Sequence, residues 1–291
     1  MDSPLSTQAI PTGHIDDPQS MERVIAALRE LHGPTYDFAL RRWHGTITFG
    51  SSPGRTRHFF VVEANQSCQL FPDLAGPGEA IWPGDVFCVN AGDEPIRVEG
   101  DGVAFEVNTE ASGYPAPRVV HLRELGDFPG GCAAYPGAFR RETLPPVRPA
   151  ADADDRRGVN RVNEHTLDMR FDRTPPPIRH CHGPVAIGPG ATVNHSETAI
   201  LLPRAVYGLP EVNKTDEGHV VVYTDPLNDP LNDPLDDPLD DPAAQVTISV
   251  RPGSFVVTPA SNQQVMGHAF ENAFAMLIAI PGFVAPYHLL A

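Results

Sequence analysis

Short β-forming runs, separated by glycine, proline and asparagine, fill two long stretches of the sequence and constrain its fold most strongly. The first stretch contains Thr46–Phe49, His58–Glu63, Ala80–Trp82, Val86–Asn90, Ile96–Glu99 and Val103–Asn108. The second contains Ile178–Ile187, Ala191–Glu197, Ala199–Leu202, His219–Tyr223, Gln245–Val250, Ser254–Thr258, Val265–Phe270 and Phe274–Ile280. Such runs, in a chain with 32 Pro and 25 Gly, are typical of all-β sandwiches, jelly rolls and barrels.

One helix is predicted before the first β-rich stretch. Asp17 and Pro18 provide an N-cap followed by proline at the first helical position, and a Gly-Pro pair at 33–34 ends the pattern. Apolar residues recur between them at helical spacing, at Met21, Val24, Ile25, Leu28 and Leu31. We expect an amphipathic helix over about 18–32 that lies against a barrel or a partner subunit. Residues 1–16 are expected to form a loose leader.

Three residues of the second stretch form a candidate metal site. Residues two apart in a strand share a face, so His195 and Glu197 present an imidazole and a carboxylate together. His268 could add a second imidazole from a neighbouring strand. Two His and one carboxylate with open positions suit Fe(II) and similar divalent ions. The HxH pair of His180 and His182 offers an additional ligand or a substrate contact.

The residues around this candidate site resemble the first motif of the cupin family, G(X)5HXH(X)3–4E(X)6G. Gly190, His195, Glu197 and Gly208 fall close to it, with the opening glycine one residue nearer than the pattern asks. Glu197 stands where the family has its second His, and Leu201 stands where it has its Glu. Cupins fold as small double-stranded β-helix (jelly-roll) barrels and often occur as duplicated bicupins.

The second cupin motif, G(X)5PXG(X)2H(X)3N, resembles the segment from Gly253 to Asn272. Gly253 and Pro259 match its beginning, and His268 with Asn272 matches its end, with a turn four residues longer between them. An ungapped match would instead place Gln264 at the ligand position. In a regular strand Gln264 and His268 would be about 13 Å apart, so one metal could not take both. His268 is favoured because imidazole is the better ligand.

The first half resembles a cupin barrel without metal ligands. In PGDVFCVNAGDEP, Gly84 and Gly92 fit the second motif, but Pro95 takes the place of the His. Upstream, the ligand positions fall in SSPGRTR, where Arg57 and its neighbours cannot replace a His–His–Glu set. The resemblance therefore implies a bicupin with a degenerate N-terminal barrel, that is, two cupin-like barrels plus one N-terminal helix.

The expected domain organisation has four parts. A leader and helix occupy residues 1–35, and the barrel that lacks metal ligands occupies 36–125, where Val119–Leu125 could add a strand. A Pro-rich linker follows at 126–176, and the metal-binding barrel spans 177–291. Within this barrel, residues 225–242 repeat DPLN and DPLD. Proline at every fourth position there excludes regular helix or sheet and predicts a surface loop.

Charge and composition exclude several classes of partner. The formal net charge is −16, and seven Asp without Lys or Arg lie in 225–242. A chain this acidic, without a stripe of basic residues, is not expected to bind nucleic acid or anionic lipid. Four scattered Cys without a CxxC pair are typical of reduced thiols inside cells. Neither a secretory signal nor a membrane-spanning run is found, so a cytoplasmic location is expected.

Taken together, the resemblance implies a metal-dependent cupin enzyme that acts on a small oxygen-bearing organic molecule. Dioxygenase-type chemistry comes first, with isomerase or lyase chemistry and a non-catalytic small-molecule-binding cupin as alternatives. One divalent ion is implied: Fe(II) is favoured, and Mn, Ni, Co or Zn remain open. Gln264 and Tyr207 are candidates to line the same cavity. The general base is not identified, and a homodimer is left open.

Overall fold

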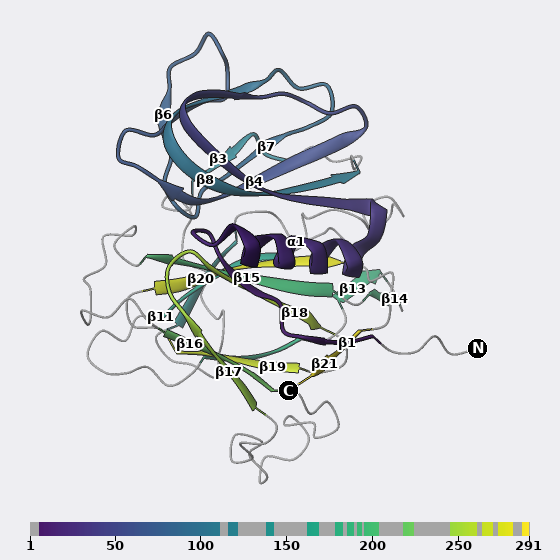
Figure 1. The fold of residues 1–291 in the computed structure, drawn as a ribbon. Helices are drawn as coiled ribbons and strands as arrows, with labels where there is room; N and C mark the ends of the chain where they lie inside the picture. Colours follow the sequence, from purple (N-terminus) through teal and green to yellow (C-terminus); the bar gives the residue numbers. More distant parts are fainter. Residues whose placement is uncertain are drawn as a thin grey trace.

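The structure of this chain is a computed structural model. It describes residues 6–110, 116–121, 138–142, 162–168, 178–182, 185–188, 191–193, 195–203, 218–223, 245–260, 264–269, 273–281 and 287–290. These residues are mostly β, with one α-helix. They form an upper curled sheet and a lower group of sheets, with the helix between them (Figure 1).

The N-terminal half is a single curled sheet of seven strands (Figure 1). Its order is β6-β5-β8-β4-β7-β9. β5 and β4 pair with successive parts of the long strand β8, and β3 pairs along the other edge of β8. The strands are β3 (Tyr36–Phe49), β4 (Arg55–Ala64), β5 (Gln69–Phe71), β6 (Glu79–Ala80), β7 (Val86–Val89), β8 (Ile96–Glu110) and β9 (Val119–Val120). β8 holds the sheet together, because it pairs with β3, β4 and β5.

Alternating residues of this sheet serve two separate cores. One face carries an aromatic cluster that includes Phe49, Phe59 and Phe87, with the Phe59 and Phe87 rings stacked at 4.6 Å. The other face carries Phe60 and Phe105, which belong to a cluster shared with the rest of the molecule. Side chains alternate across a strand, so a run such as Phe59–Val62 is apolar throughout because both of its faces are buried.

Helix α1 (Pro18–His32) confirms the predicted helix. The Asp17 side chain caps its N-terminus by accepting hydrogen bonds from the backbone N–H groups of Gln19 and Ser20, which have no partner inside the helix. Its C-terminus ends at Gly33, whose φ of 59° favours glycine. The helix lies between the upper sheet and the lower sheets (Figure 1).

The C-terminal half is built from several sheets. A six-stranded sheet has the order β10-β11-β20-β15-β18-β2, a four-stranded sheet has the order β12-β19-β16-β17, and β13 pairs with β14. The four-stranded sheet lies below the six-stranded one, on the side away from α1 (Figure 1). The strands are β10 (Ala138–Glu142), β11 (Val162–Asp168), β12 (Ile178–His182), β13 (Val185–Gly188), β14 (Ala191–Val193), β15 (His195–Pro203), β16 (Gly218–Tyr223), β17 (Gln245–Val250), β18 (Ser254–Ala260), β19 (Gln264–Ala269), β20 (Ala273–Pro281) and β21 (Tyr287–Leu290).

A single apolar cluster joins the two halves. It combines Leu28 and Leu31 of α1 with Phe105 of the N-terminal sheet and with Ile200 and Phe255 of the six-stranded sheet. Each of these side chains is fully buried. The helix therefore acts as a shared layer of the core, and burial of its apolar stripe stabilises both halves at once.

Several local predictions need correction. The expected loose leader, residues 1–16, contributes β1 (Ser6–Ala9), which pairs with β21, and β2 (Thr12–His14), which pairs with β18. The segment expected to be only a linker contributes β10 and β11 to the six-stranded sheet. β1, β2 and β11 pair with strands far along the chain, so the local pattern gives no sign of these pairings, whereas β10 pairs with β11 inside the same segment.

Two strands predicted separately, Ile96–Glu99 and Val103–Asn108, form the single strand β8. The chain continues through Gly100, whose φ is 102° and where a Cβ would lie 2.8 Å from the Cα of Cys68. Glycine is needed there because the backbone around Cys68 approaches closely, and it does not end the strand. The closure of two separate barrels and the domain boundaries stay predictions, and the repeat at 225–242 lies outside the described residues.

Candidate functional site

Strand β15 carries the first two predicted ligands. Its even-numbered residues, among them Ser196, Thr198 and Ile200, are fully buried, and Ile200 packs in the cluster that contains α1. His195 and Glu197 alternate with these residues and therefore belong to the opposite face of the sheet. That face is turned away from α1, toward the four-stranded sheet (Figure 1).

The helix is attached to β15 beside these two positions. The His32 imidazole and the Ser196 hydroxyl are 2.6 Å apart, and both side chains are buried. The His32 ring also packs edge-on against Tyr36, with ring centroids 5.3 Å apart. A buried polar contact of this kind fixes the helix relative to the strand, because separating the two groups would break a hydrogen bond that water cannot replace in the core.

The other predicted ligands lie in the four-stranded sheet. In the pairing of β12 with β19, His268 is opposite Ile178, Met266 is opposite His180, and Gln264 is opposite His182. His268 is also opposite Val220, which pairs with Ile248 of β17. In β17, Val250 is buried while Ser249 is exposed, so Ile248 and its row belong to the buried face. By this register His268, Gln264, His180 and His182 share that face.

The structure therefore assigns the predicted ligands to two strands, in sheets that lie one below the other. His195 and Glu197 come from β15, and His268 comes from β19. The pairing of β19 is continuous from Gln264 to His268, which confirms the regular strand that makes these two residues alternatives. Tyr207 lies outside the described residues. The ligand role of these residues stays a prediction, since the structure describes them by strand position.

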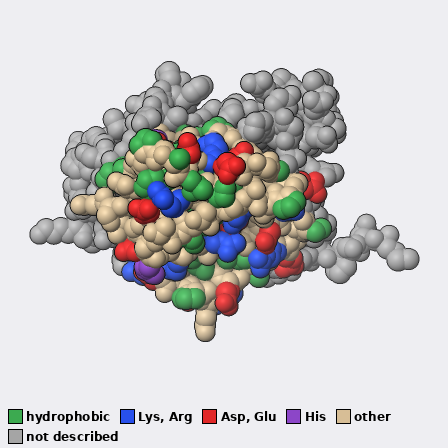
Figure 2. Space-filling view, turned by 90° about the horizontal axis from the view of Figure 1, so that it is seen from above, with side chains coloured by type: hydrophobic (Ala, Val, Ile, Leu, Met, Phe, Trp, Pro, Cys, Tyr) green, Lys and Arg blue, Asp and Glu red, His purple; other side chains and the backbone are tan. Residues whose placement is uncertain are grey.

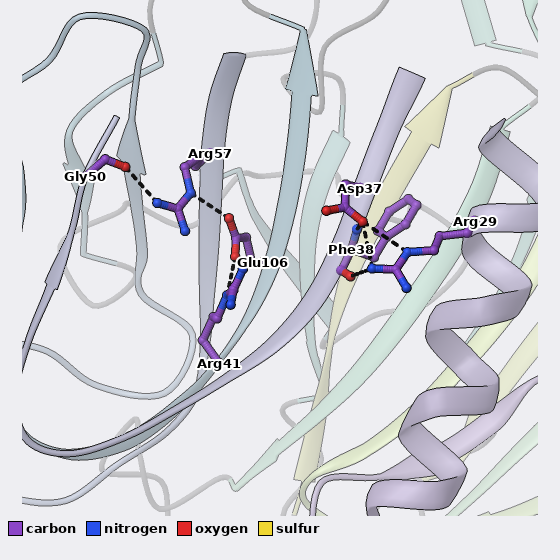
Figure 3. Close-up of polar contacts among 7 residues, drawn as sticks. All are labelled: Arg29, Asp37, Phe38, Arg41, Gly50, Arg57 and Glu106. Atoms are coloured by element: carbon purple, nitrogen blue, oxygen red, sulfur yellow. Dashed lines mark hydrogen bonds and ion pairs between the residues drawn. The ribbon is translucent and has the colours of Figure 1, made fainter. Parts of the chain in front are cut away.

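A polar cluster that the sequence analysis missed lies in the N-terminal sheet. The Glu106 carboxylate, 3% exposed, accepts hydrogen bonds from Nε of Arg57 at 2.6 Å and from Nε of Arg41 (Figure 3). Arg57 also donates to the carbonyl of Gly50 at 2.7 Å. These residues alternate with Phe60 and Phe105, so they belong to the face that carries the aromatic cluster. A single carboxylate is thus held by two guanidinium groups.

A second charged cluster closes the end of the N-terminal sheet. His121 lies 3.0 Å from the buried Asp85 carboxylate and 3.4 Å from Glu79. Asp85 also accepts a hydrogen bond from the backbone N–H of Trp82 at 2.9 Å. The hydrogen bond with Asp85 raises the pKa of His121 to about 9, supported by the charge of Glu79 and opposed by burial.

We expect the His121 cluster to make stability depend on pH. Because the folded pKa is raised, the stabilisation is complete below about pH 6.5 and is lost as pH rises through about 9. With allowance for solvent screening it amounts to about 2 kcal/mol. Urea denaturation of wild type and His121→Gln should differ by this amount at pH 6 and converge by pH 10. A difference in the free energy of unfolding between the two proteins that stays constant from pH 6 to pH 10 would contradict the assignment.

Two buried titratable groups of the N-terminal half are electrically silent. His58 is fully buried, and burial lowers its pKa to about 3, so its ring is neutral at physiological pH. Its Nδ1 lies 3.3 Å from Sγ of Cys88, and burial raises the pKa of that thiol. A thiol with a raised pKa is a poor nucleophile, so this pair is a core contact.

The described surface and side chains limit where other sites can lie. Seen from above, basic and acidic side chains are interspersed on the described part of the face (Figure 2). Among the described large apolar side chains, Leu74 is the exposed one. Within the described residues, no three His, Cys, Asp or Glu side chains converge to hold a metal ion. No helix of the described chain is long and apolar enough to cross a membrane.

Comparisons with known proteins bear on the fold. No family model and no curated relative matches the sequence. An IolB-like protein from Salmonella typhimurium LT2 matches the structure with a TM-score of 0.50 and 13% identity, over 98% of this chain and 94% of its own. A cupin 2 conserved barrel domain protein from Leptotrichia buccalis matches with a TM-score of 0.42 and 13% identity, over 97% and 92%. Oxalate decarboxylase from Lactobacillus farciminis matches with a TM-score of 0.41 and 10% identity, over 87% and 78%.

At these identities the likeness concerns the fold alone. The structural neighbours include cupin-domain proteins, some of which are enzymes and some of unknown function. This chain is mostly β, with a curled sheet and one helix, and it shares its overall fold with the IolB-like protein.

Proposed function

We propose that this chain is a metal-dependent cupin enzyme that acts on a small oxygen-bearing organic molecule, with dioxygenase-type chemistry first and isomerase or lyase chemistry as the alternative. His195, Glu197 and His268 would hold one divalent ion, with Fe(II) favoured. When bound, the ion would supply Lewis-acid or oxygen-activating chemistry. The observation that carries the proposal is the strand register of the C-terminal half.

The register supports the donor set in two ways. His195 and Glu197 share the face of β15 that is turned toward the four-stranded sheet, and His268 shares the buried face of that sheet. Two imidazoles and one carboxylate match the ligands that Fe(II), Mn and similar ions accept. The opposite face of β15 is filled by the core around α1 and by the His32–Ser196 contact, so that face has no room for a ligand.

The register also ranks the additional candidates. His180 is diagonal to His268 across the β12–β19 pair, and diagonal neighbours are about 7–8 Å apart. His182 lies one more pair along, directly opposite Gln264. His180 is therefore the better candidate for binding or orienting a substrate beside His268. His182 would become the neighbour of the metal only if Gln264 took the ligand role.

A non-catalytic binding cupin is the second candidate, favoured by Leu201. This residue stands where the cupin motif has a Glu, and its side chain is fully buried. It belongs to the same face of β15 as His195 and Glu197. An apolar side chain there cannot act as a ligand or move a proton, which removes one polar group from the cavity.

Metal content measured by mass spectrometry on tag-free, chelator-free protein tests the proposal. We expect near-stoichiometric metal in the wild type and its loss in His195→Ala and His268→Ala. His219→Ala is the matched control, because His219 is paired with the exposed Ser249 and belongs to the other face of its sheet. Metal retained in both ligand variants would move the site to His180 and His182. No metal in any sample after reconstitution would leave a ligand-binding cupin. Oxygen consumption by the metal-loaded protein would separate a dioxygenase from an isomerase, a lyase or a binding protein.

A further inference from the structure

A cleft of about 570 Å³ lies where the N-terminal sheet meets the end of β15. Its apolar walls come from Val62 and Val103 of the sheet, from Trp82 and Pro83, and from Pro203 at the end of β15. Clefts of this size at the junction of two structural units are typical of small-molecule sites. Apart from Pro203, its lining comes from residues 42–103, and the role inferred for it does not involve the proposed metal ligands.

The charged groups of the cleft differ in how they are engaged. Asp101 accepts hydrogen bonds from the backbone N–H of Gly45 and from Asn65, and it lies 3.4 Å from the His44 ring. The Arg42 guanidinium donates to the carbonyl of Ile15. Glu63, by contrast, has no hydrogen-bond or ion-pair partner within the described residues. The Glu63 residue is exposed, and its carboxylate is bonded to no described residue, so an incoming ligand can reach it.

The electrostatic surroundings of Glu63 call for a positive charge. Partial burial and, to a smaller degree, the Asp16 carboxylate raise the pKa of Glu63, and the charges of Arg42 and His14 oppose them only in part. The Arg42 guanidinium is already engaged with Ile15, and Arg251, 4.0 Å from Asp16, offsets part of the charge of that carboxylate. The net charge of −16 also attracts cations to the whole molecule.

We propose that this cleft binds a small primary amine with an apolar body. The ammonium group would lie beside Glu63, where it makes a charge-assisted hydrogen bond. The body would pack on Val62, Val103 and Trp82, and the Trp82 ring can also face the cation. Because an ammonium group stabilises the ionised carboxylate, binding releases protons in mildly acidic solution.

Isothermal titration calorimetry of the full chain with 2-phenylethylamine tests the proposal. We expect saturable binding at millimolar concentration or below, with 2-phenylethanol and 3-phenylpropanoate at least tenfold weaker. Glu63→Gln should weaken amine binding at least tenfold. The matched control is Glu22→Gln, which removes the same charge from an exposed position on α1 outside the cleft. Titrations at pH 5 in buffers of different ionisation enthalpy should report proton release, and Glu63→Gln should abolish it.

The remaining outcomes overturn the proposal. If the amine does not bind at about 10 mM, or if amine and alcohol bind equally well, the carboxylate does not recognise an ammonium group and the proposal is wrong. Equal binding by wild type and Glu63→Gln would place the amine elsewhere on this acidic protein. The metal content of the same samples reports separately on the proposed enzyme site, so failure at one site does not count against the other.

Discussion

Glu106→Ala is expected to lower the free energy of unfolding by about 3 kcal/mol. The substitution leaves the guanidinium groups of Arg57 and Arg41 without the carboxylate that neutralises them (Figure 3). Arg57 is only 15% exposed, so water cannot replace the lost partner fully, whereas Arg41 is 44% exposed and can turn to solvent. Most of the loss therefore comes from the uncompensated charge of Arg57. Guanidinium chloride unfolding followed by tryptophan fluorescence measures it.

Two further variants separate charge from packing at Glu106. Arg41→Ala should cost about 1 kcal/mol, because it removes the more solvated partner of the pair. The double variant Glu106→Leu with Arg57→Leu should recover most of the stability, since apolar residues can replace a buried ion pair without loss. A Glu106→Ala variant as stable as wild type would show that the cluster is hydrated and contributes little.

The helix and most strands could be predicted because their signals are local. The Asp17 cap, the apolar spacing from Met21 to Leu31 and the Gly33 stop all lie within one short segment, and α1 has the predicted bounds. The pairing of β1 with β21 could not be predicted, because it joins Ser6–Ala9 to Tyr287–Leu290 at opposite ends of the sequence. Strand propensity shows that a segment can be extended but does not identify its partner.

The polar sites were harder to predict than the fold. Arg57 was visible as a basic residue at a position where cupins place ligands, but nothing near it in sequence identifies Glu106, its partner from β8. Glu106 does leave one signal: it is a charged residue between Phe105 and Val107 in an otherwise apolar run. A charge in such a run is buried on the second face of the strand and therefore needs a partner. The same reasoning from strand alternation predicted one shared face for His195 and Glu197, and their role as metal ligands together with His268 stays a prediction.

Phe105→Ala is expected to have the largest effect on stability, about 4 kcal/mol. Phe105 is fully buried where the two halves meet. Its ring stacks on Phe38 at 6.2 Å and meets Phe255 of the six-stranded sheet edge-on at 5.4 Å. Truncation removes these contacts and leaves a cavity that the paired strands β3, β4 and β8 cannot close.

The same substitution should also reduce the cooperativity between the halves. Both Trp residues, Trp43 and Trp82, belong to the N-terminal half, so fluorescence reports that half alone while far-UV circular dichroism reports the whole chain. In wild type the two transitions should coincide, because one apolar cluster spans both halves. In Phe105→Ala the fluorescence and circular-dichroism transitions should separate. Phe87→Ala, within the aromatic cluster of the N-terminal sheet, is the matched control. It should lower the free energy of unfolding by a similar amount, while its two transitions still coincide as in wild type. A double-mutant cycle of Phe105 with Phe255 should give a coupling of about 1 kcal/mol, and a coupling near zero would mean that the halves fold independently.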